Sequence, residues 1–132
     1  AEQLDSGTPI VELLPKLPAV FLVGAPSVSV LESILARAWM LAVGTGAPSL
    51  VIDCGGLASG AERGFERAYA SFLDQAEGSA LQIVLSGARR PLRERAEQLA
   101  GERNLAFTHF ERVDAAVTHA LERAGHLLMR RS

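Results

Sequence analysis

Residues 50–54 read LVIDC, and a glycine pair at positions 55 and 56 follows them. The run is short, apolar and rich in β-branched residues, which is typical of a strand buried on both faces of a sheet. The glycine pair ends the run, because glycine is depleted within strands and common in turns. Segments with helical spacing lie on both sides, so the run predicts a central strand of a sheet whose strands alternate with helices.

The same alternation extends over most of the chain. Residues 27–43 and 59–77 place apolar side chains three and four positions apart, as amphipathic helices do. The predicted order is β-β-α-β-α-β-α-β-α, with elements at residues 10–14, 19–24, 27–43, 50–54, 59–77, 80–85, 91–100, 105–110 and 112–129. This order predicts an α/β fold with a mixed, mostly parallel sheet, and the prolines at 15 and 18 predict an N-terminal antiparallel hairpin.

The chain is 132 residues long and 48% hydrophobic, which fits one globular domain. We predict a flexible tail or linker over residues 1–8 and the domain over residues 9–132. The first residue is alanine rather than methionine. We expect the chain to be either processed or part of a longer protein, for example one with an N-terminal sensor domain.

Charge and cysteine content exclude several classes of function. The formal charge of -2 argues against a nucleic-acid partner, which needs a concentrated positive field. The single cysteine, Cys54, excludes an internal disulfide and a cysteine-cluster metal site, and we expect neither a metal nor a cofactor. No apolar run reaches the roughly 18 residues of a membrane span. No signal sequence opens the chain, so the expected location is the cytoplasm.

Residues capable of chemistry gather after the central strand. Asp53 lies where open α/β sheets place their working residues, and it is either a ligand or base there or a cap of the following loop. Cys54 is either a nucleophile activated by the next helix or a small buried residue. Ser59 and Glu62 have the spacing of a capping box, in which each side chain bonds the other's backbone N–H. The helix N-terminus at Gly60 is an alternative anion site.

Other polar groups carry weaker signals. The three histidines lack the spacing of a zinc-binding helix motif. Four arginines lie before and along the third predicted helix and are interleaved with glutamates: Arg89, Arg90, Arg93 and Arg95. This pattern is typical of a solvated face with ion pairs. The alternative is a surface that binds a partner. No combination of nucleophile, base and oxyanion donors is visible, so the residues predict a domain that is not an enzyme.

The element order and three short passages resemble the STAS domain, the fold of bacterial anti-sigma factor antagonists and of the cytoplasmic tails of sulfate transporters. Residues 49–57 (SLVIDCGGL) look like the family's strand that ends in Asp, a small residue and Gly. Residues 81–87 (LQIVLSG), leading into Pro91, are similar to its next strand and helix opening, and residues 113–117 (VDAAV) are similar to the start of its last helix. Residues 8–11 and 21–24 look most like the stressosome scaffold and antagonist branch. The resemblance covers nearly the whole chain from Thr8.

In that family a partner kinase phosphorylates a serine or threonine at the start of the second helix, usually after an aspartate, and the added charge switches binding. Counting from Asp53 places this pair at Ala61 and Glu62, so that a glutamate replaces the acceptor hydroxyl. Three interpretations stay open. Glu62 is a fixed charge that resembles the phosphorylated form, or the site is vestigial and Glu62 serves only the capping box, or a loop shift gives Ser59 the acceptor role.

The resemblance implies a non-catalytic signalling domain of the bacterial stress response, which binds a switch kinase, other STAS-domain proteins or copies of itself. The implied surface comprises three segments at one end of the sheet: Ala25–Ser27, Gly56–Phe65 and Ser86–Pro91. Its regulatory residues are Ser59, Glu62, Arg63 and Asp53. The alternative function is a ligand- or nucleotide-sensing module that binds an anion at the second helix N-terminus, and a third is a small enzyme that uses Cys54.

Overall fold

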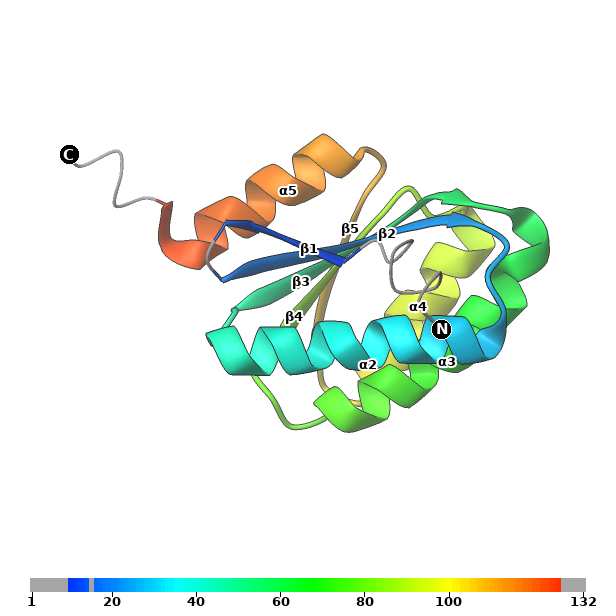
Figure 1. Ribbon diagram of the computed structural model, residues 1–132, viewed down its shortest axis with the longest axis horizontal. Helices are drawn as coiled ribbons and strands as arrows, with labels where there is room; N and C mark the ends of the chain where they lie inside the picture. The colour runs from blue at the N-terminus through cyan, green and yellow to red at the C-terminus, as the bar shows by residue number, and fades with distance from the viewer. Residues whose placement is uncertain (1–9, 15, 127–132) are drawn as a thin grey trace.

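The computed structural model describes residues 10–14 and 16–126, and it contains a five-stranded mixed sheet (Figure 1). The strands lie side by side in chain order: β1 (Ile10–Leu14), β2 (Leu17–Gly24), β3 (Ser49–Leu57), β4 (Gln82–Ser86) and β5 (Ala106–Phe110). β1 pairs antiparallel with β2, and each later pair is parallel. The predicted α/β class, the N-terminal hairpin and the mostly parallel sheet are therefore confirmed.

Helices cover the two faces of the sheet unequally. The helices are α2 (Val28–Thr45), α3 (Glu62–Ala76), α4 (Arg90–Glu102) and α5 (Val113–Leu121), with a 3₁₀ turn η1 (Ser59–Ala61) and a π-helical turn η2 (Glu122–His126). In Figure 1, α2, α3 and α4 lie on one face and α5 lies on the other. Every parallel crossover steps to the next strand in the same direction, so right-handed connections place their helices on one side.

The central strand β3 contributes to two cores. Leu50 and Ile52 face the larger core beneath α2, α3 and α4, whereas Val51 faces the smaller core beneath α5. All three side chains are fully buried. This two-sided burial explains why the strand is a continuous apolar run rather than an alternation of apolar and polar residues.

The first helix follows its sequence signals closely. The Ser27 hydroxyl accepts a hydrogen bond from the Val30 N–H at 3.3 Å and thereby caps α2. Gly46 adopts a left-handed conformation (φ 68°) just after the last turn, and its N–H bonds to the carbonyls of the preceding turn. The helix begins within one residue of its predicted start and ends two residues beyond the predicted Val43.

Among the elements whose bounds differ from their predictions, β3 and the last helix are informative. β3 runs to Leu57 instead of Cys54, because after a register shift Gly56 and Leu57 still pair with Val23 and Gly24 of β2. The last helix is shorter than predicted, because regular α-helix ends at Leu121 and Gly125 in the following π-turn has a φ of 94°. The predicted continuation to Met129, the predicted tail at residues 1–8 and the hairpin proline at position 15 lie outside the described residues.

One described helix, α2, is long and apolar enough to cross a membrane by length and composition, with a mean hydropathy of 1.3 over 18 residues. Glu32 and Arg37 interrupt it, so the sequence shows no unbroken apolar run of that length. One face of α2 packs into the larger core through Leu31, Ile34, Leu35, Ala38 and Ala42. A core helix of this kind meets the same criteria as a membrane span.

Candidate functional site

The three segments implied as a binding surface do lie together, at the carboxyl ends of β2, β3 and β4 (Figure 1). We call Ala25–Ser27, Gly56–Phe65 and Ser86–Pro91 the carboxyl-end surface. The Ala58 N–H donates to the Gly24 carbonyl at 2.8 Å, which joins the β2–α2 and β3–α3 connections. Carboxyl ends of parallel strands meet at one edge of a sheet, and that edge is where open α/β folds place their sites.

Asp53 fixes the backbone around this surface. It is half-buried in the middle of β3, and its Oδ1 accepts hydrogen bonds from the Ser86 hydroxyl at 2.9 Å and from the Gly55 N–H at 3.2 Å. Ser86 is fully buried and lies opposite Asp53 in the sheet register. Of the two predicted roles for Asp53, the geometry matches the loop cap, because this carboxylate oxygen already serves two donors.

Cys54 is a buried core residue. Its side chain is 4% exposed and packs in the larger core. Burial raises the pKa of the thiol far above its usual range, and the negative charges of Asp53 and Glu62 raise it further. A nucleophilic cysteine needs a low pKa and solvent access, so the surroundings of Cys54 oppose nucleophilic chemistry.

The predicted capping box between Ser59 and Glu62 is wrong. Ser59 begins a 3₁₀ turn, and α3 starts only at Glu62, with Ala61 as an N-cap residue that has no side-chain acceptor. Glu62 is therefore the first residue of the helix rather than its third, and it cannot reach back as the motif requires. Its carboxylate instead accepts a hydrogen bond from the Arg89 guanidinium, Nε to Oε2, at 2.7 Å.

The Glu62–Arg89 pair bridges two connections of the surface. Arg89 precedes α4, and its side chain is 56% exposed, against 24% for Glu62. A pair of this exposure contributes little to stability, on the order of 0–1 kcal/mol. Its position matters more, because it presents a fixed charge pair where the β3–α3 and β4–α4 connections meet.

The remaining predicted residues, Ser59 and Arg63, are exposed at the start of α3. Neither side chain is held by a hydrogen bond or ion pair to any residue that the structure describes. The structure thus brings Ser59, Glu62 and Arg63 to one surface, whereas Asp53 lies beneath it and is directed at Ser86.

Sequence reasoning included Arg89 in the implied surface but missed its pairing with Glu62, and it missed the exposure of Val23 near this surface. The sequence shows Arg89 within an arginine cluster, but its partner Glu62 is 27 positions away and no local pattern indicates the pairing. Val23 is 74% exposed at the end of β2, although the apolar run of residues 19–24 predicts a buried strand. Successive residues of a strand point to opposite faces, so the burial of Leu22 places Val23 on the other face. This alternation is the feature of the sequence from which its exposure could have been inferred.

A basic hollow borders the surface at the start of α4. Arg89, Arg90 and Arg93 line it together with Glu111, and its volume is about 360 Å³. Beneath it the Ala88 N–H donates to Nε2 of His109 at 3.2 Å. Burial lowers the pKa of His109, and the nearby Arg93 lowers it further against the opposing effect of Glu111. The imidazole is thus held neutral, with Nε2 as the acceptor.

Among residues 10–14 and 16–126, no group of three or more His, Cys, Asp or Glu side chains is arranged to hold a metal ion. Comparison of the sequence with protein-family models finds none that matches, and comparison with curated proteins finds no significant match.

Proposed function

We propose that this chain is a non-catalytic protein-interaction domain of the STAS type, which regulates signalling by binding a switch kinase or STAS-domain proteins, its own copies included. Its carboxyl-end surface would be the docking site. The observation that carries the proposal is the partly exposed Glu62–Arg89 pair, which stands where the β3–α3 and β4–α4 connections meet. The partners named are cytoplasmic proteins, so the proposal includes a cytoplasmic location.

The state of the polar residues supports binding over catalysis. Oδ1 of Asp53 is occupied by Ser86 and Gly55, and the Cys54 thiol is buried and protonated. Catalysis by nucleophile or general base needs a group with a matched pKa within reach of a substrate. The exposed groups of this surface are instead a carboxylate, arginines and a serine, which suit recognition of another protein surface.

Among the three interpretations of Glu62, the ion pair supports the fixed charge. A phosphorylated side chain at a helix start typically acts by pairing with arginine. Glu62 places a carboxylate at the start of α3 and pairs it with Arg89 without modification. The interpretation that depends on a capping box loses its basis, because Glu62 makes no such contact. Ser59 remains exposed and open to a kinase.

Val23 supplies the apolar component that interfaces generally need. Binding energy concentrates in a few apolar and arginine side chains near the centre of an interface, with polar groups around them. Val23 is 74% exposed. Its Cα and Cγ2 atoms both lie 3.5 Å from the position that a Cβ atom on Gly56 would occupy. Val23 thus offers an exposed apolar group next to Gly56, one end of the Gly56–Phe65 segment.

The test measures binding of candidate partners, namely the small ATP-binding switch kinases and STAS-domain proteins of the source organism, by titration calorimetry. We expect Glu62→Lys to weaken binding by about tenfold or more, because charge reversal at an interface places like charges together. The matched control is Glu77→Lys, the same charge change at the far end of α3, where the residue is exposed. Equal affinities for the wild type and Glu62→Lys would contradict the proposal.

A charge swap, Glu62→Arg with Arg89→Glu, separates recognition from folding. It preserves an ion pair between the two connections while reversing its direction. We expect the swapped protein to melt within a few degrees of the wild type and still to lose binding. If the swapped protein bound its partner as tightly as the wild type, the Glu62–Arg89 pair would serve only to hold the two connections together.

The ligand-sensing alternative, in which an anion binds at the N-terminus of the second helix near Gly60, has weaker support. Glu62 places a carboxylate in the first turn of α3, where an anion would have to bind. A thermal-shift screen with nucleotides tests this alternative, since specific binding raises the melting temperature as ligand concentration rises.

A further inference from the structure

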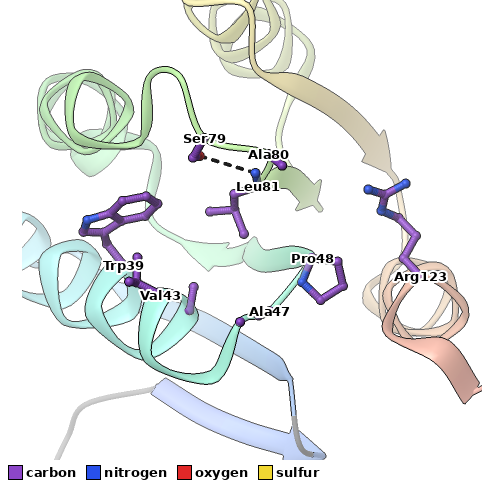
Figure 2. Close-up of a pocket in the computed structure, with 10 residues that line it drawn as sticks. Trp39, Val43, Ala47, Pro48, Ser79, Ala80, Leu81 and Arg123 are labelled. Carbon is purple, nitrogen blue, oxygen red and sulfur yellow. Dashed lines mark hydrogen bonds between the residues drawn. The ribbon is translucent and has the colours of Figure 1, made fainter.

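A second hollow lies at the opposite end of the sheet, beside the amino ends of β3 and β4 (Figure 2). It has a volume of about 450 Å³, within the range of small-molecule sites. The last turns of α2, the Gly46–Pro48 connection and the Ser79–Leu81 connection form most of its wall. Arg123 of η2 completes it. We call this hollow the amino-end groove.

The walls of the amino-end groove are mostly apolar. Leu81 is buried, and Trp39 is half-buried with the edge of its ring against Phe72, the ring centroids 6.3 Å apart. Val43 is 58% exposed although it belongs to the core helix α2. Figure 2 shows Trp39 and Arg123 at opposite ends, with Leu81 and Pro48 between them. The groove is therefore an elongated apolar surface with a cation at one end.

Arg123 is held in position by a buried polar chain. Its Nε donates to the Ser49 hydroxyl at 3.1 Å, and that hydroxyl donates to Oε1 of Gln82 at 3.3 Å. The same Gln82 oxygen lies 3.0 Å from Nε2 of His119. Ser49 and Gln82 are buried, so the guanidinium is fixed at its Nε side while its two Nη groups make no bond to the described residues.

The charge of Arg123 is not neutralised within the described part of the chain, where no carboxylate forms an ion pair with it. It is also the one ionisable residue among those that line the groove there. The C-terminal end of α2 lies nearby and adds partial negative charge from its last carbonyls. One cation beside a helix C-terminus suits a single negative charge better than a phosphate.

We propose that the amino-end groove binds a small monocarboxylate with an unbranched apolar body, such as a medium-chain fatty acid. The carboxylate accepts hydrogen bonds from the Nη groups of Arg123, and the apolar body lies along Pro48 and Leu81 toward Trp39. Arginine and carboxylate form strong charge-assisted hydrogen bonds, and the apolar walls bury the chain. This site lies at the opposite end of the sheet from the carboxyl-end surface and does not depend on the function proposed there.

Trp39 is the only tryptophan in the chain, so its fluorescence reports on the groove directly. The probe is octanoate, compared with octanol, which has the apolar body without the charge, and with acetate, which has the charge without the body. We expect a saturable blue shift with octanoate at a dissociation constant of about 0.1–1 mM for a ligand of this size. Octanol should bind about five- to tenfold more weakly, and acetate should leave the emission unchanged.

Two variants test the assigned roles. Arg123→Gln should weaken octanoate binding to the level of octanol, whereas Arg67→Gln, an exposed arginine of α3 outside the groove, should leave it unchanged. Val43→Glu places a carboxylate on an exposed part of the wall, so it should abolish octanoate binding without affecting the fold. Thermal melts confirm that each variant is folded.

Three results would overturn the proposal. They are a linear rather than saturable response to octanoate, equal affinities for octanoate and octanol, and undiminished binding by the folded Val43→Glu variant. None of these measurements involves the carboxyl-end surface. A result that overturns the groove proposal would therefore leave the interaction proposal intact.

Discussion

Gly87 lies at a point of the candidate site that leaves no room for a side chain. It has a φ of 68°, and a Cβ atom added there would lie 2.8 Å from both the Cα and the nitrogen of Gly55. The two glycines allow the start of the β4–α4 connection to approach the backbone of β3 closely, beside the hydrogen bond between Ser86 and Asp53. A glycine is required here both for its conformation and for its lack of a side chain.

We predict that Gly87→Ala lowers the free energy of unfolding by about 2–5 kcal/mol, since a left-handed conformation costs about 1–2 kcal/mol and overpacking about 1–3 kcal/mol. Gly101→Ala is the matched control, because Gly101 lies within α4 and nothing surrounds the added Cβ within 4 Å. That variant should be neutral or more stable by up to about 1 kcal/mol. Urea unfolding measures both, and a Gly87→Ala protein as stable as the wild type would contradict the prediction.

At the scale of single residues, the sequence predicted positions better than contacts. It placed Asp53 and Cys54 in the central strand, where the structure has them, although the strand continues for three more residues to Leu57. It could not pair Glu62 with Arg89 or Asp53 with Ser86, because these partners are 27 and 33 positions apart. The capping box failed for a local reason. The motif depends on which residue begins the helix, and the 3₁₀ turn at Ser59–Ala61 moves that start by three residues.

At the scale of elements, Tyr69 joins α3 to α4. Its ring is fully buried and stacks on Phe65 with centroids 5.4 Å apart. Its hydroxyl donates to the Ala96 carbonyl at 3.2 Å. Burial raises the pKa of this phenol well above its usual range, so the hydroxyl stays a donor at every working pH.

We predict that Tyr69→Phe lowers the free energy of unfolding by about 0.5–1.5 kcal/mol, the usual net value of one buried hydrogen bond. The ring and its packing remain, so the denaturant m-value should not change. Tyr69→Ala provides the comparison, because loss of the whole ring should cost about 3–5 kcal/mol. Tyr69→Phe with unchanged stability would show that this hydrogen bond does not strengthen the α3–α4 contact.

The elements themselves were predictable because each has a local cause. The apolar run of β3 reflects burial on both faces, and Ser27 with Gly46 marks the ends of α2. The errors have tertiary causes. β3 extends to Leu57 because β2 continues to pair with it, which no feature of residues 55–57 indicates. The final helix ends earlier because apolar spacing predicts a face but not the left-handed turn at Gly125.

At the scale of the whole molecule, the two cores differ in size. The core beneath α2, α3 and α4 contains aromatic and long aliphatic side chains, including Phe65, Tyr69 and Phe72. The core beneath α5 is smaller, and α5 contributes to it mainly through Ala116 and Ala120, which are fully buried but have short side chains. Less apolar area is lost from water on that face, so its helix is held by less free energy.

We therefore predict that α5 opens without unfolding of the rest of the domain. Native-state hydrogen exchange by NMR should give the amides of residues 117–121 an opening free energy several kcal/mol below that of residues 69–73 in α3. The α5 value should also depend less on denaturant, because a local opening exposes less surface than global unfolding. Ala116→Gly should lower the α5 value further by about 1 kcal/mol and leave the local opening of other elements unchanged. If the amides of α5 and α3 instead followed a single exchange isotherm, the sheet and all its helices would unfold as one unit, and the unequal cores would have no energetic consequence.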